Sequence, residues 1–317
     1  MFRYIPGTQI MQIEEELKAI SPQKETIFSV GVFDGVHLGH RHLLSRLIER
    51  AQEHGWLSGV LTFKSHPQIV LRPDSNLALL DNLEHRLELL KSLGIDIVTA
   101  LSFTLELSQL GPREFITLLK DHLNIRGLII GPDFALGKDR EGSANQLYAL
   151  GRELGFSVEA MPPFRVNGEV VSSSSIRRAL SAGDMDKANK YLGRPFRLAG
   201  NVVHGDQRGG SVLGFPTANI EVPREQAIPA DGVYATIAYL NHEPLPSVTN
   251  IGLRPTFKGH HRTIETFILD FQGELHNQDI KVEFIGKLRG EKRFNTPDML
   301  TEQIRKDVEQ ARLILGK

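Results

Sequence analysis

The spacing of hydrophobic and polar positions in the first half of the chain switches repeatedly between two patterns. Short β-branched segments alternate with longer segments whose apolar residues recur at helical spacing, as at 43–51 before Gly55. This alternation predicts a doubly wound α/β domain, in which crossover helices cover a parallel sheet and ligands bind at the carboxyl ends of the strands. The expected strands are 27–31, 57–63, 95–101, 126–131 and 156–161.

The pattern changes after about Gly183. The segment 181–196, SAGDMDKANKYLGRPF, predicts a short polar helix or linker. Beyond it, strand-like segments separated by Gly, Pro and Asn predict a small antiparallel β-barrel or sandwich. The expected strands are 197–204, 233–240, 246–251, 264–271 and 280–285.

A final amphipathic helix is expected to close the chain against the barrel. Thr296 and Pro297 suit its N-cap and first turn. One apolar stripe follows them, formed by Leu300, Ile304, Val308, Ala311 and Leu315.

Length and composition divide the chain in two. It has 317 residues, more than one average domain, and its 40% hydrophobic and 24% charged residues are those of a globular protein. With the change of pattern, this predicts a first domain at 1–183, a linker at 184–196 and a second domain at 197–317.

Charge and cysteine content exclude several classes of function. Lys and Arg number 37 against 38 Asp and Glu, so the formal charge is −1 and no basic arm is present to bind nucleic acid. The absence of cysteine excludes disulfides, zinc-thiolate and iron–sulfur centres, and a thiol nucleophile. No apolar run approaches the roughly 20 residues of a membrane span, and the first 20 residues lack a signal-peptide pattern. We expect a soluble cytoplasmic protein without a membrane partner; composition leaves its oligomeric state open.

The segment GVFDGVHLGH, residues 31–40, stands where the first strand should turn into the first helix, a usual place for phosphate binding. Its glycines would let the backbone approach a ligand closely. His37 and His40, three residues apart, would both donate hydrogen bonds to a polyphosphate. Two alternatives stay open: a tight turn with structural histidines, or a zinc site, for which the sequence offers no obvious further ligands.

A second anion-binding corner is expected at 172–177. Serines at a predicted helix start, followed by Arg177, suit the β and γ phosphates of ATP. The alternative is a simple serine helix cap.

The tetrapeptide PTAN in the second half suits a cation. Thr217 and Asn219 alternate by two, so on an extended segment their side chains face the same way. Two neutral oxygens on one side fit a hard cation shared with ATP phosphates. Alternatively, the tetrapeptide is a turn that leads into a strand.

Glu265 lies in the strand-like run IETFILDF. Alternation places it on the same face as Phe267, Leu269 and Phe271, where a lone carboxylate is costly unless it is paired or used. A structural partner such as Arg254 or Arg262 is the alternative to a catalytic role.

The motifs of the first half resemble a known family. GxFDGxHxGH resembles the signature of the HxGH nucleotidyltransferases, in the form found in the adenylyltransferase module of bacterial bifunctional riboflavin kinase/FAD synthetases. Further segments resemble that family in the same order, although Ser65 and Ser174 replace its usual Pro and Thr. They are TFKSHPQIVL at 62–71, IGPDFALGKDREG at 130–142 and VSSSSIRRAL at 171–180.

The second half resembles the riboflavin kinase domain of the same family over nearly all its length. Two positions depart from the family pattern. Phe267 stands where a His is common, and the loop RGGSVLG lacks a basic residue, for which Arg208 is the candidate substitute. The matching segments are 200–220, 231–236, 247–257 and 264–275.

The resemblance implies an enzyme that makes FMN from riboflavin in its second domain and FAD from FMN in its first. ATP would be co-substrate and Mg²⁺ the metal in both reactions, so riboflavin, FMN, FAD and ATP are the expected partners. It makes Glu265 the catalytic base of the kinase, and His37, His40 and Arg177 the charge-stabilising groups of adenylyl transfer. Metal binding falls to Thr217 and Asn219, and ATP or flavin contacts to Gly31, Phe33, Asp34, Gly35, Gly39, His66, Asp133, Phe134, Ser173, Ser174, Gly214, Phe215, Pro216 and Arg289.

Two other functions compete with this interpretation. The first-half motif alone would also suit a nucleotidyltransferase acting on another phosphate ester, but PTAN and ETFILDF in the same chain argue against it. A non-catalytic flavin or nucleotide sensor is disfavoured because it needs neither a base nor a metal corner.

Overall fold

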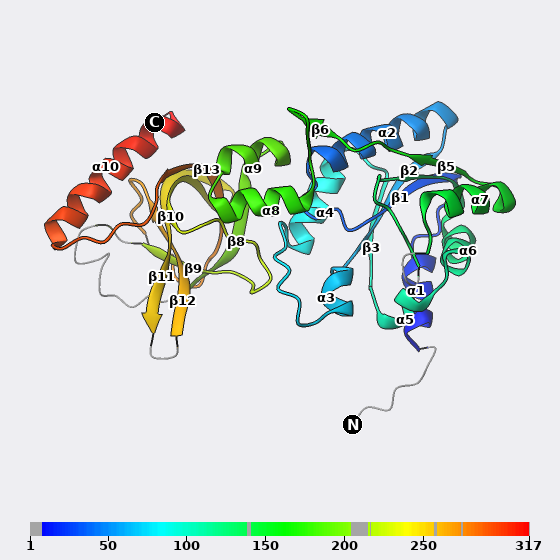
Figure 1. The fold of residues 1–317 in the computed structure, drawn as a ribbon, viewed down its shortest axis with the longest axis horizontal. Helices are drawn as coiled ribbons and strands as arrows, with labels where there is room; N and C mark the ends of the chain where they lie inside the picture. The colour runs from blue at the N-terminus through cyan, green and yellow to red at the C-terminus, as the bar shows by residue number, and fades with distance from the viewer. Residues whose placement is uncertain are drawn as a thin grey trace, which may run out of the picture. The chain divides into compact units, whose positions relative to one another are not determined.

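The computed structural model describes residues 8–137, 141–203, 215, 217–256, 259–273 and 275–316, and for 8–10, 254–256 and 259–261 the backbone alone. It contains an α/β unit and a β-barrel unit, which are described in turn (Figure 1).

The α/β unit is built on a five-stranded parallel sheet with the strand order β3-β2-β1-β4-β5. The first strand is therefore central, and the chain changes direction across the sheet between β1 and β4, which is where doubly wound folds bind ligands. The prediction of a doubly wound domain is confirmed. The strands are β1 (Thr26–Val30), β2 (Leu57–Phe63), β3 (Ile97–Leu101), β4 (Ile125–Ile130) and β5 (Ser157–Ala160).

Helices cover both faces of this sheet because alternate strand residues are apolar on both sides. One core joins Phe28, Leu61 and Leu128 to α1 (Thr8–Lys18), α5 (Leu105–Gln109), α6 (Pro112–Leu123) and α7 (Ala144–Leu154). The other joins Ile27, Val60 and Ile129 to α2 (Leu38–His54) and α4 (Leu83–Ser92). A short helix, α3 (Pro67–Leu71), follows β2, and β6 (Arg165–Val166) and β7 (Glu169–Val170) form a hairpin.

The second unit is a closed barrel with the strand order β10-β11-β12-β9-β8-β13, so the barrel alternative is confirmed over the sandwich. Every pairing within it is antiparallel. The strands are β8 (Phe196–Val203), β9 (Ala218–Glu221), β10 (Gly232–Leu240), β11 (Glu243–Thr256), β12 (Gly259–Ile268) and β13 (Asp279–Arg289).

A ladder of hydroxyl groups is buried in the barrel. The Oγ1 atom of Thr249 lies 2.8 Å from that of Thr236 and 2.9 Å from that of Thr266, and Thr236 also bonds Ser247. All four residues are fully buried. Because each hydroxyl finds a partner, the ladder avoids the cost of unsatisfied buried polar groups.

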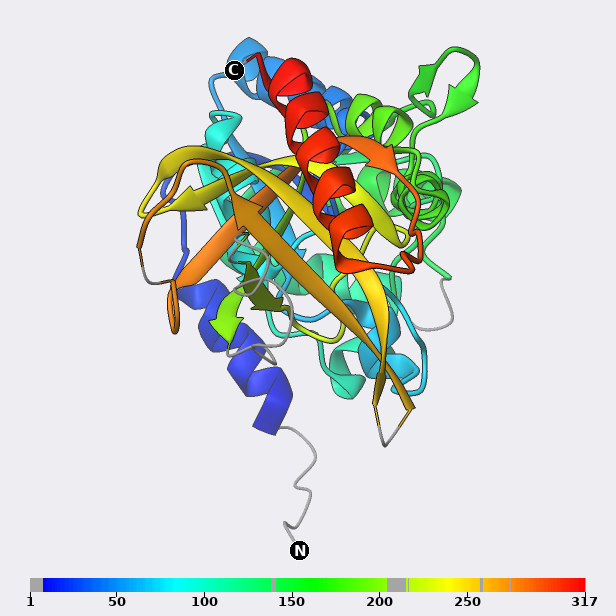
Figure 2. The ribbon, with the colours of Figure 1, turned by 90° about the vertical axis from the view of Figure 1, so that its left-hand side faces the viewer.

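The last helix, α10 (Pro297–Leu315), begins as predicted. Thr296 caps it by accepting a hydrogen bond from the Met299 N–H, and Pro297 is its first residue. Figure 2 shows the helix lying across the outside of the barrel. Val308, Ala311 and Leu315 pack there against strand residues that include Val233, Ala235 and Val248.

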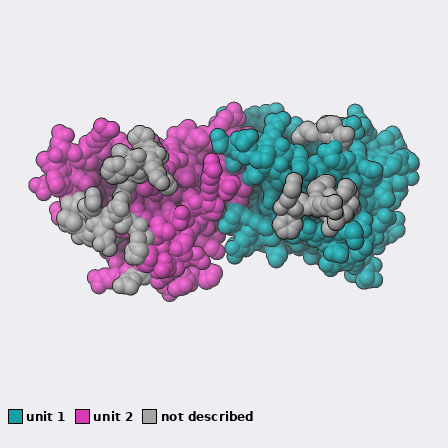
Figure 3. Space-filling view, turned by 90° about the horizontal axis from the view of Figure 1, so that it is seen from below, with its two compact units in different colours: residues 1–77, 82–171 teal, residues 78–81, 172–317 magenta. Residues whose placement is uncertain are grey.

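The packing divides the chain at a different place from the expected boundary. The units are 1–77 with 82–171, and 78–81 with 172–317 (Figure 3). Residues 172–183 form α8 (Ser173–Ala182) with its two caps, and the expected linker 184–196 forms α9 (Met185–Leu192) and the start of β8. Both helices belong to the barrel unit.

The packing of α9 explains this difference. Its polar sequence carries an apolar stripe that includes Met185, Ala188 and Leu192, and all three side chains are buried. The amide of Asn189 donates to the Phe284 carbonyl at 2.8 Å and accepts from the Phe196 N–H at 2.8 Å. These contacts make α9 a packed part of the barrel unit.

Candidate active sites

Most of the residues predicted for adenylyl transfer in the α/β unit lie on loops at one edge of the sheet. His37 and His40 follow β1, His66 follows β2, and Asp133 and Phe134 follow β4. These three strands are parallel neighbours, so their carboxyl ends share an edge at the switch point between β1 and β4. The structure thus brings these residues to the edge that the sequence predicted.

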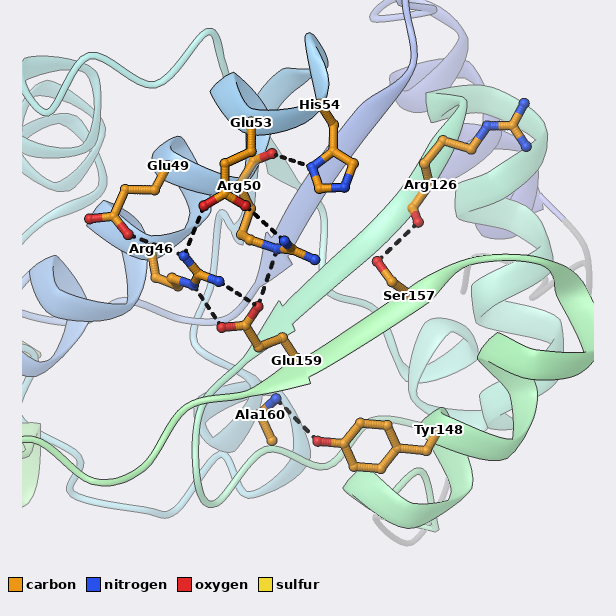
Figure 4. Close-up of polar contacts among 10 residues, drawn as sticks. All are labelled: Arg46, Glu49, Arg50, Glu53, His54, Arg126, Tyr148, Ser157, Glu159 and Ala160. Atoms are coloured by element: carbon orange, nitrogen blue, oxygen red, sulfur yellow. Dashed lines mark hydrogen bonds and ion pairs between the residues drawn. The ribbon is translucent and has the colours of Figure 1, made fainter.

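The helix α2, which begins next to His37, is held to the sheet by ion pairs farther along its length. Arg46 and Arg50 of α2 bond Glu159 of β5, with Nε–Oε distances of 2.8 and 3.3 Å, and both also contact Glu53 (Figure 4). Each of these surface pairs is weak because water screens the charges, but together the pairs link α2 to the edge of the sheet.

The loop between β1 and α2 has an uncommon backbone. Phe33 and Val36 adopt positive φ values of 53° and 34°, and Gly35 has a φ of 87°. A β-branched residue in this region is strained by about 1–3 kcal/mol, and such strain persists where surrounding contacts enforce it. Phe33 and Asp34 are buried, at 4% and 2% exposure, so their side chains support the loop from inside the protein.

His37 is the N-cap of α2. Its Nδ1 accepts a hydrogen bond from the His40 N–H at 3.3 Å, so the neutral ring carries its proton on Nε2. A Cβ atom at Gly39 would lie 3.1 Å from Cε1 of His37 and 3.2 Å from the Val171 carbonyl. A side chain at position 39 would therefore press on the His37 ring, and Gly39 leaves the ring its present place.

His40 stacks on His37, with 3.7 Å between the ring centroids. Burial, and secondarily the neighbouring His37, hold the pKa of His40 well below its usual range. His40 is therefore uncharged at neutral pH, and the pair is suited to hydrogen bonding rather than to acting as two cations.

His66, Asp133 and Phe134 differ in their surroundings. Nδ1 of His66 accepts from the Gln68 N–H at 3.1 Å and so caps α3. Asp133 is exposed, and Phe134 is partly buried against the core that contains Phe28 and Leu128. Their contact with flavin or nucleotide stays a prediction.

Arg86 is a residue that the sequence analysis missed. It is 3% exposed, and its Nη1 and Nη2 donate to the carbonyls of Val32 and Phe63 at 3.0 and 2.8 Å. It thereby ties the end of β2 to the loop after β1. The available signal was an arginine on the buried stripe of α4, four residues before Leu90.

The predicted anion corner is a capped helix start in the barrel unit. Ser172 is the N-cap of α8 and accepts from the Ser175 N–H at 3.2 Å. Ser173 and Ser174 lie in the first turn, and Nε of Arg177 bonds the carbonyl of Ala78. Their role in adenylyl transfer stays a prediction.

The barrel places Glu265 between two asparagines. Glu265 of β12 stands opposite Asn219 of β9 and opposite Asn250 of β11. The next residue, Thr266, is buried inside the barrel, so alternation turns Glu265 and its two neighbours to the outer face. The sequence predicted Glu265 and Asn219 separately; Asn250 joins them only through the strand register.

This arrangement fits a magnesium ion. Thr217 directly precedes β9, and both it and Asn219 are half-buried. Across the described residues, no cluster of three or more His, Asp or Glu side chains could hold a metal. Mg²⁺ does not need one, since it commonly takes one or two protein oxygens and completes its shell with water and phosphate oxygens.

Phe267, which departs from the family pattern, contacts another motif residue. Its ring packs edge-to-face on Phe215, with 5.3 Å between centroids, and it stands opposite Val248 in the next row of the outer face. The predicted contact residues Gly214 and Pro216, and the candidate substitute Arg208, lie outside the described residues.

The arginines proposed as partners of Glu265 are differently placed. Nε of Arg262 donates to Asp231 at 2.7 Å, and alternation turns Arg262 to the other face of β12 from Glu265. The side chain of Arg254 lies outside the described residues.

Arg289, a predicted ligand contact, is engaged within the protein. Its guanidinium donates hydrogen bonds to the Asp307 carboxylate of α10 with N–O distances of 2.8 to 3.0 Å, and the Gln303 amide donates to the same carboxylate at 2.9 Å. The Arg289 and Asp307 side chains are only 15% and 4% exposed. A direct ligand contact by Arg289 stays a prediction.

Comparison with known proteins identifies both halves. Residues 19–175 match the FAD synthetase family model and residues 192–315 match the riboflavin kinase model. The bifunctional riboflavin kinase/FMN adenylyltransferase of Escherichia coli (strain K12) is 37% identical, with 93% of this chain and 95% of that protein covered. The protein of the same name from Pseudomonas fluorescens is 38% identical, with 96% and 98% covered.

A solved structure agrees over nearly the whole chain. It is described as a macrolide-efflux protein from Streptococcus pneumoniae, with a TM-score of 0.86, 28% identity, and 94% of this chain and 97% of that chain covered. In the part of our chain that the structure describes, no helix combines the length and apolarity needed to cross a membrane. The two family models and the curated relatives confirm the resemblance found in the motifs: the chain belongs to the bifunctional riboflavin kinase/FMN adenylyltransferase family.

Proposed function

We propose that the barrel unit phosphorylates riboflavin to FMN and that the α/β unit adenylylates FMN to FAD, each with Mg·ATP. The observation that carries the kinase assignment is the register of β9 and β12, which sets the carboxylate of Glu265 opposite Asn219. The adenylyltransferase assignment rests on His37 at the switch point of the parallel sheet.

The kinase reaction needs a base. The 5′-hydroxyl of riboflavin is neutral, so its proton must leave as the oxygen attacks the γ-phosphorus of ATP. Glu265 accepts that proton; the new bond joins the 5′-oxygen to phosphorus, and the bond between the γ-phosphorus and the ADP oxygen breaks. Thr217 and Asn219 would hold Mg²⁺, which when bound offsets the negative charge of the phosphates.

The adenylyl transfer needs no base. The FMN phosphate is already an anion, and its attack on the α-phosphorus of ATP releases pyrophosphate. The site must align two phosphate groups and stabilise charge on the leaving oxygens. His37 can donate from Nε2, because its Nδ1 is occupied by the His40 N–H, and α2 directs its positive end to the same place.

Single substitutions should separate the two reactions. With riboflavin, ATP and Mg²⁺ supplied, chromatography of the wild-type products should show both FMN and FAD. Glu265→Gln should form no FMN yet convert added FMN to FAD. His37→Asn should do the reverse, since asparagine keeps the helix cap but lacks the Nε2 donor.

Glu221→Gln is a matched control, because this exposed carboxylate lies on β9 two residues beyond Asn219. It should retain both activities. If folded Glu265→Gln lost both activities, the assignment of one reaction to each unit would be wrong. Activity on another phosphate ester in place of FMN would favour the alternative nucleotidyltransferase, and binding without turnover would favour a sensor.

We further propose a cytoplasmic location without nucleic-acid partners. The absence of cysteine and the balanced charge support this assignment. Cell fractionation that recovered the protein from a membrane or extracellular fraction would contradict it.

A further inference from the structure

The hydroxyl ladder inside the barrel lies next to the row of Asn219, Glu265 and Asn250 on its outer face. Glu265 stands opposite Asn250, and the neighbouring pair of the same two strands is Thr266 and Thr249. The Oγ1 atoms of this pair lie 2.9 Å apart, and both side chains are fully buried. Because successive residues of a strand face opposite sides, a hydroxyl pair inside the barrel joins β11 to β12 directly beside the carboxylate outside.

The ladder continues to a third strand. Thr236 of β10 is paired with Ser247 of β11, and its Oγ1 lies 2.8 Å from the hydroxyl oxygens of both Ser247 and Thr249. Thr249 is therefore bonded to hydroxyls on the strands at both of its sides. A buried hydroxyl that loses its partner is costly, so the ladder favours the one arrangement of β10, β11 and β12 that pairs every hydroxyl.

A slip of β12 by two residues would keep its apolar side chains inside the barrel but would break this match. In one direction Thr266 would face the buried Ile251, and its hydroxyl would lose its partner. On the outer face Glu265 would then stand opposite Gly252, about 7 Å along the strand from its present place. The slip in the other direction is opposed by charge, because it would set Arg262 against Ile251.

We propose that Thr249 and Thr266 are positioning residues of the kinase, whose buried hydroxyl bond selects the register that keeps Glu265 beside Asn250 and Asn219. Phosphoryl transfer depends on this register because the base and the metal corner must reach the same substrate together. Both threonines are fully buried, so they act through the strands and not by touching a substrate. This inference rests on the proposed kinase function.

A double substitution tests the hydroxyls without emptying the core. Thr249→Val with Thr266→Val replaces both partners by apolar groups of the same shape, which should leave the barrel as stable as wild type or more so. The kcat of FMN formation should fall about tenfold, because molecules in the shifted register lack an aligned base. Conversion of added FMN to FAD should stay within about twofold of wild type. Thr249→Ser with Thr266→Ser keeps the hydroxyls and should restore most of the kcat.

The next inner pair of the same two strands, Ile251 and Ile264, provides the matched control. Ile251→Val with Ile264→Val removes one buried methyl group from each side chain and should lower the urea midpoint of the barrel. Its kcat for FMN formation should stay within about twofold of wild type. Hydrogen exchange of β12 and β13 in increasing urea measures the stability of the barrel. The threonine variant should thus lose activity without stability, and the isoleucine variant stability without activity.

An engineered disulfide reads the register directly. The chain has no cysteine, and Val248 and Phe267 stand opposite each other in the next outer pair. Val248→Cys with Phe267→Cys should cross-link on oxidation in the native register, whereas a shift of two residues moves the Cα atoms beyond the roughly 7 Å that a disulfide spans. Adding Thr249→Val and Thr266→Val should lower the yield of cross-linked protein. The cross-linked molecules should regain kcat relative to the same protein in reduced form.

Three results would overturn the proposal. One is a kcat for FMN formation within about twofold of wild type in the threonine-to-valine double variant, and another is an equal loss of kcat in the isoleucine variant. The third is a fall in FAD formation as large as the fall in FMN formation. A wild-type enzyme that formed no FMN, or Glu265→Gln that still formed it, would instead overturn the proposed kinase function itself.

Discussion

The barrel unit contains two Arg–Asp pairs with the same shortest N–O distance and very different burial. Asp307 lies 2.8 Å from Arg289, with side chains 4% and 15% exposed. Asp270 lies 2.8 Å from Arg312, with side chains 74% and 37% exposed. Removing one partner of a buried pair leaves an uncompensated charge and costs about 3–5 kcal/mol, whereas an exposed pair is worth about 0–1 kcal/mol.

Asparagine substitutions of Asp307 and Asp270 should differ in their effect on stability. Asp307→Asn should lower the unfolding free energy of the barrel by about 3 kcal/mol, the low end of the range for a broken buried pair because the amide oxygen still accepts one hydrogen bond. Asp270→Asn should lower it by less than about 1 kcal/mol. Asparagine also suits the positive φ of 58° at position 270, so the control adds no backbone strain.

The assay must resolve the two units of the chain. Hydrogen exchange of β13 and α10, followed by mass spectrometry in increasing urea, reports on the barrel. The single tryptophan, Trp56, lies in the α/β unit and reports on that unit by fluorescence. Its transition should be the same in all variants. Equal destabilisation of the barrel by Asp307→Asn and Asp270→Asn would refute the reasoning from burial.

Three further predictions concern the adenylyltransferase site. Because the pKa of His40 is lowered in the folded protein, the unfolded chain binds more protons than the folded chain below the usual histidine pKa of about 6.5. The stability of the α/β unit should therefore fall as the pH drops through that value. The urea midpoint of Trp56 fluorescence should show this fall in wild type and less of it in His40→Gln; equal pH dependence would contradict it. Gly39→Ala should displace the His37 ring and lower kcat/KM of adenylylation about tenfold. Gly131→Ala should leave kcat/KM unchanged, because a Cβ atom there would meet only Leu43, at 3.8 Å. Equal activity of the two variants would refute the packing argument. Arg86→Met should lower adenylylation at least about tenfold by releasing two backbone carbonyls, and should spare FMN formation. Unchanged adenylylation in folded Arg86→Met would show that the loop is held by other contacts.

Features that depend on neighbouring residues were predictable from the sequence alone. The strands of the parallel sheet, the barrel strands other than β9, the start of α10 at Thr296 and the stripe that includes Ala311 follow from local periodicity and capping. The short strand β9 and the β6–β7 hairpin were not predicted, because segments of two to four residues show too little alternation. The placement of His37 and Asp133 at one sheet edge was also predictable, because the carboxyl ends of parallel strands always lie together.

The tertiary structure alone decided which distant side chains meet. Asn250 joins Glu265 and Asn219 through barrel closure and strand register, and no local pattern encodes that register. Arg86 and Asp307 find their partners by long-range packing, where a buried charge is tolerated only because another part of the chain satisfies it. The sequence by itself determined the elements and their chemistry, while the tertiary structure determined the pairing of side chains, because pairing depends on contacts far apart along the chain.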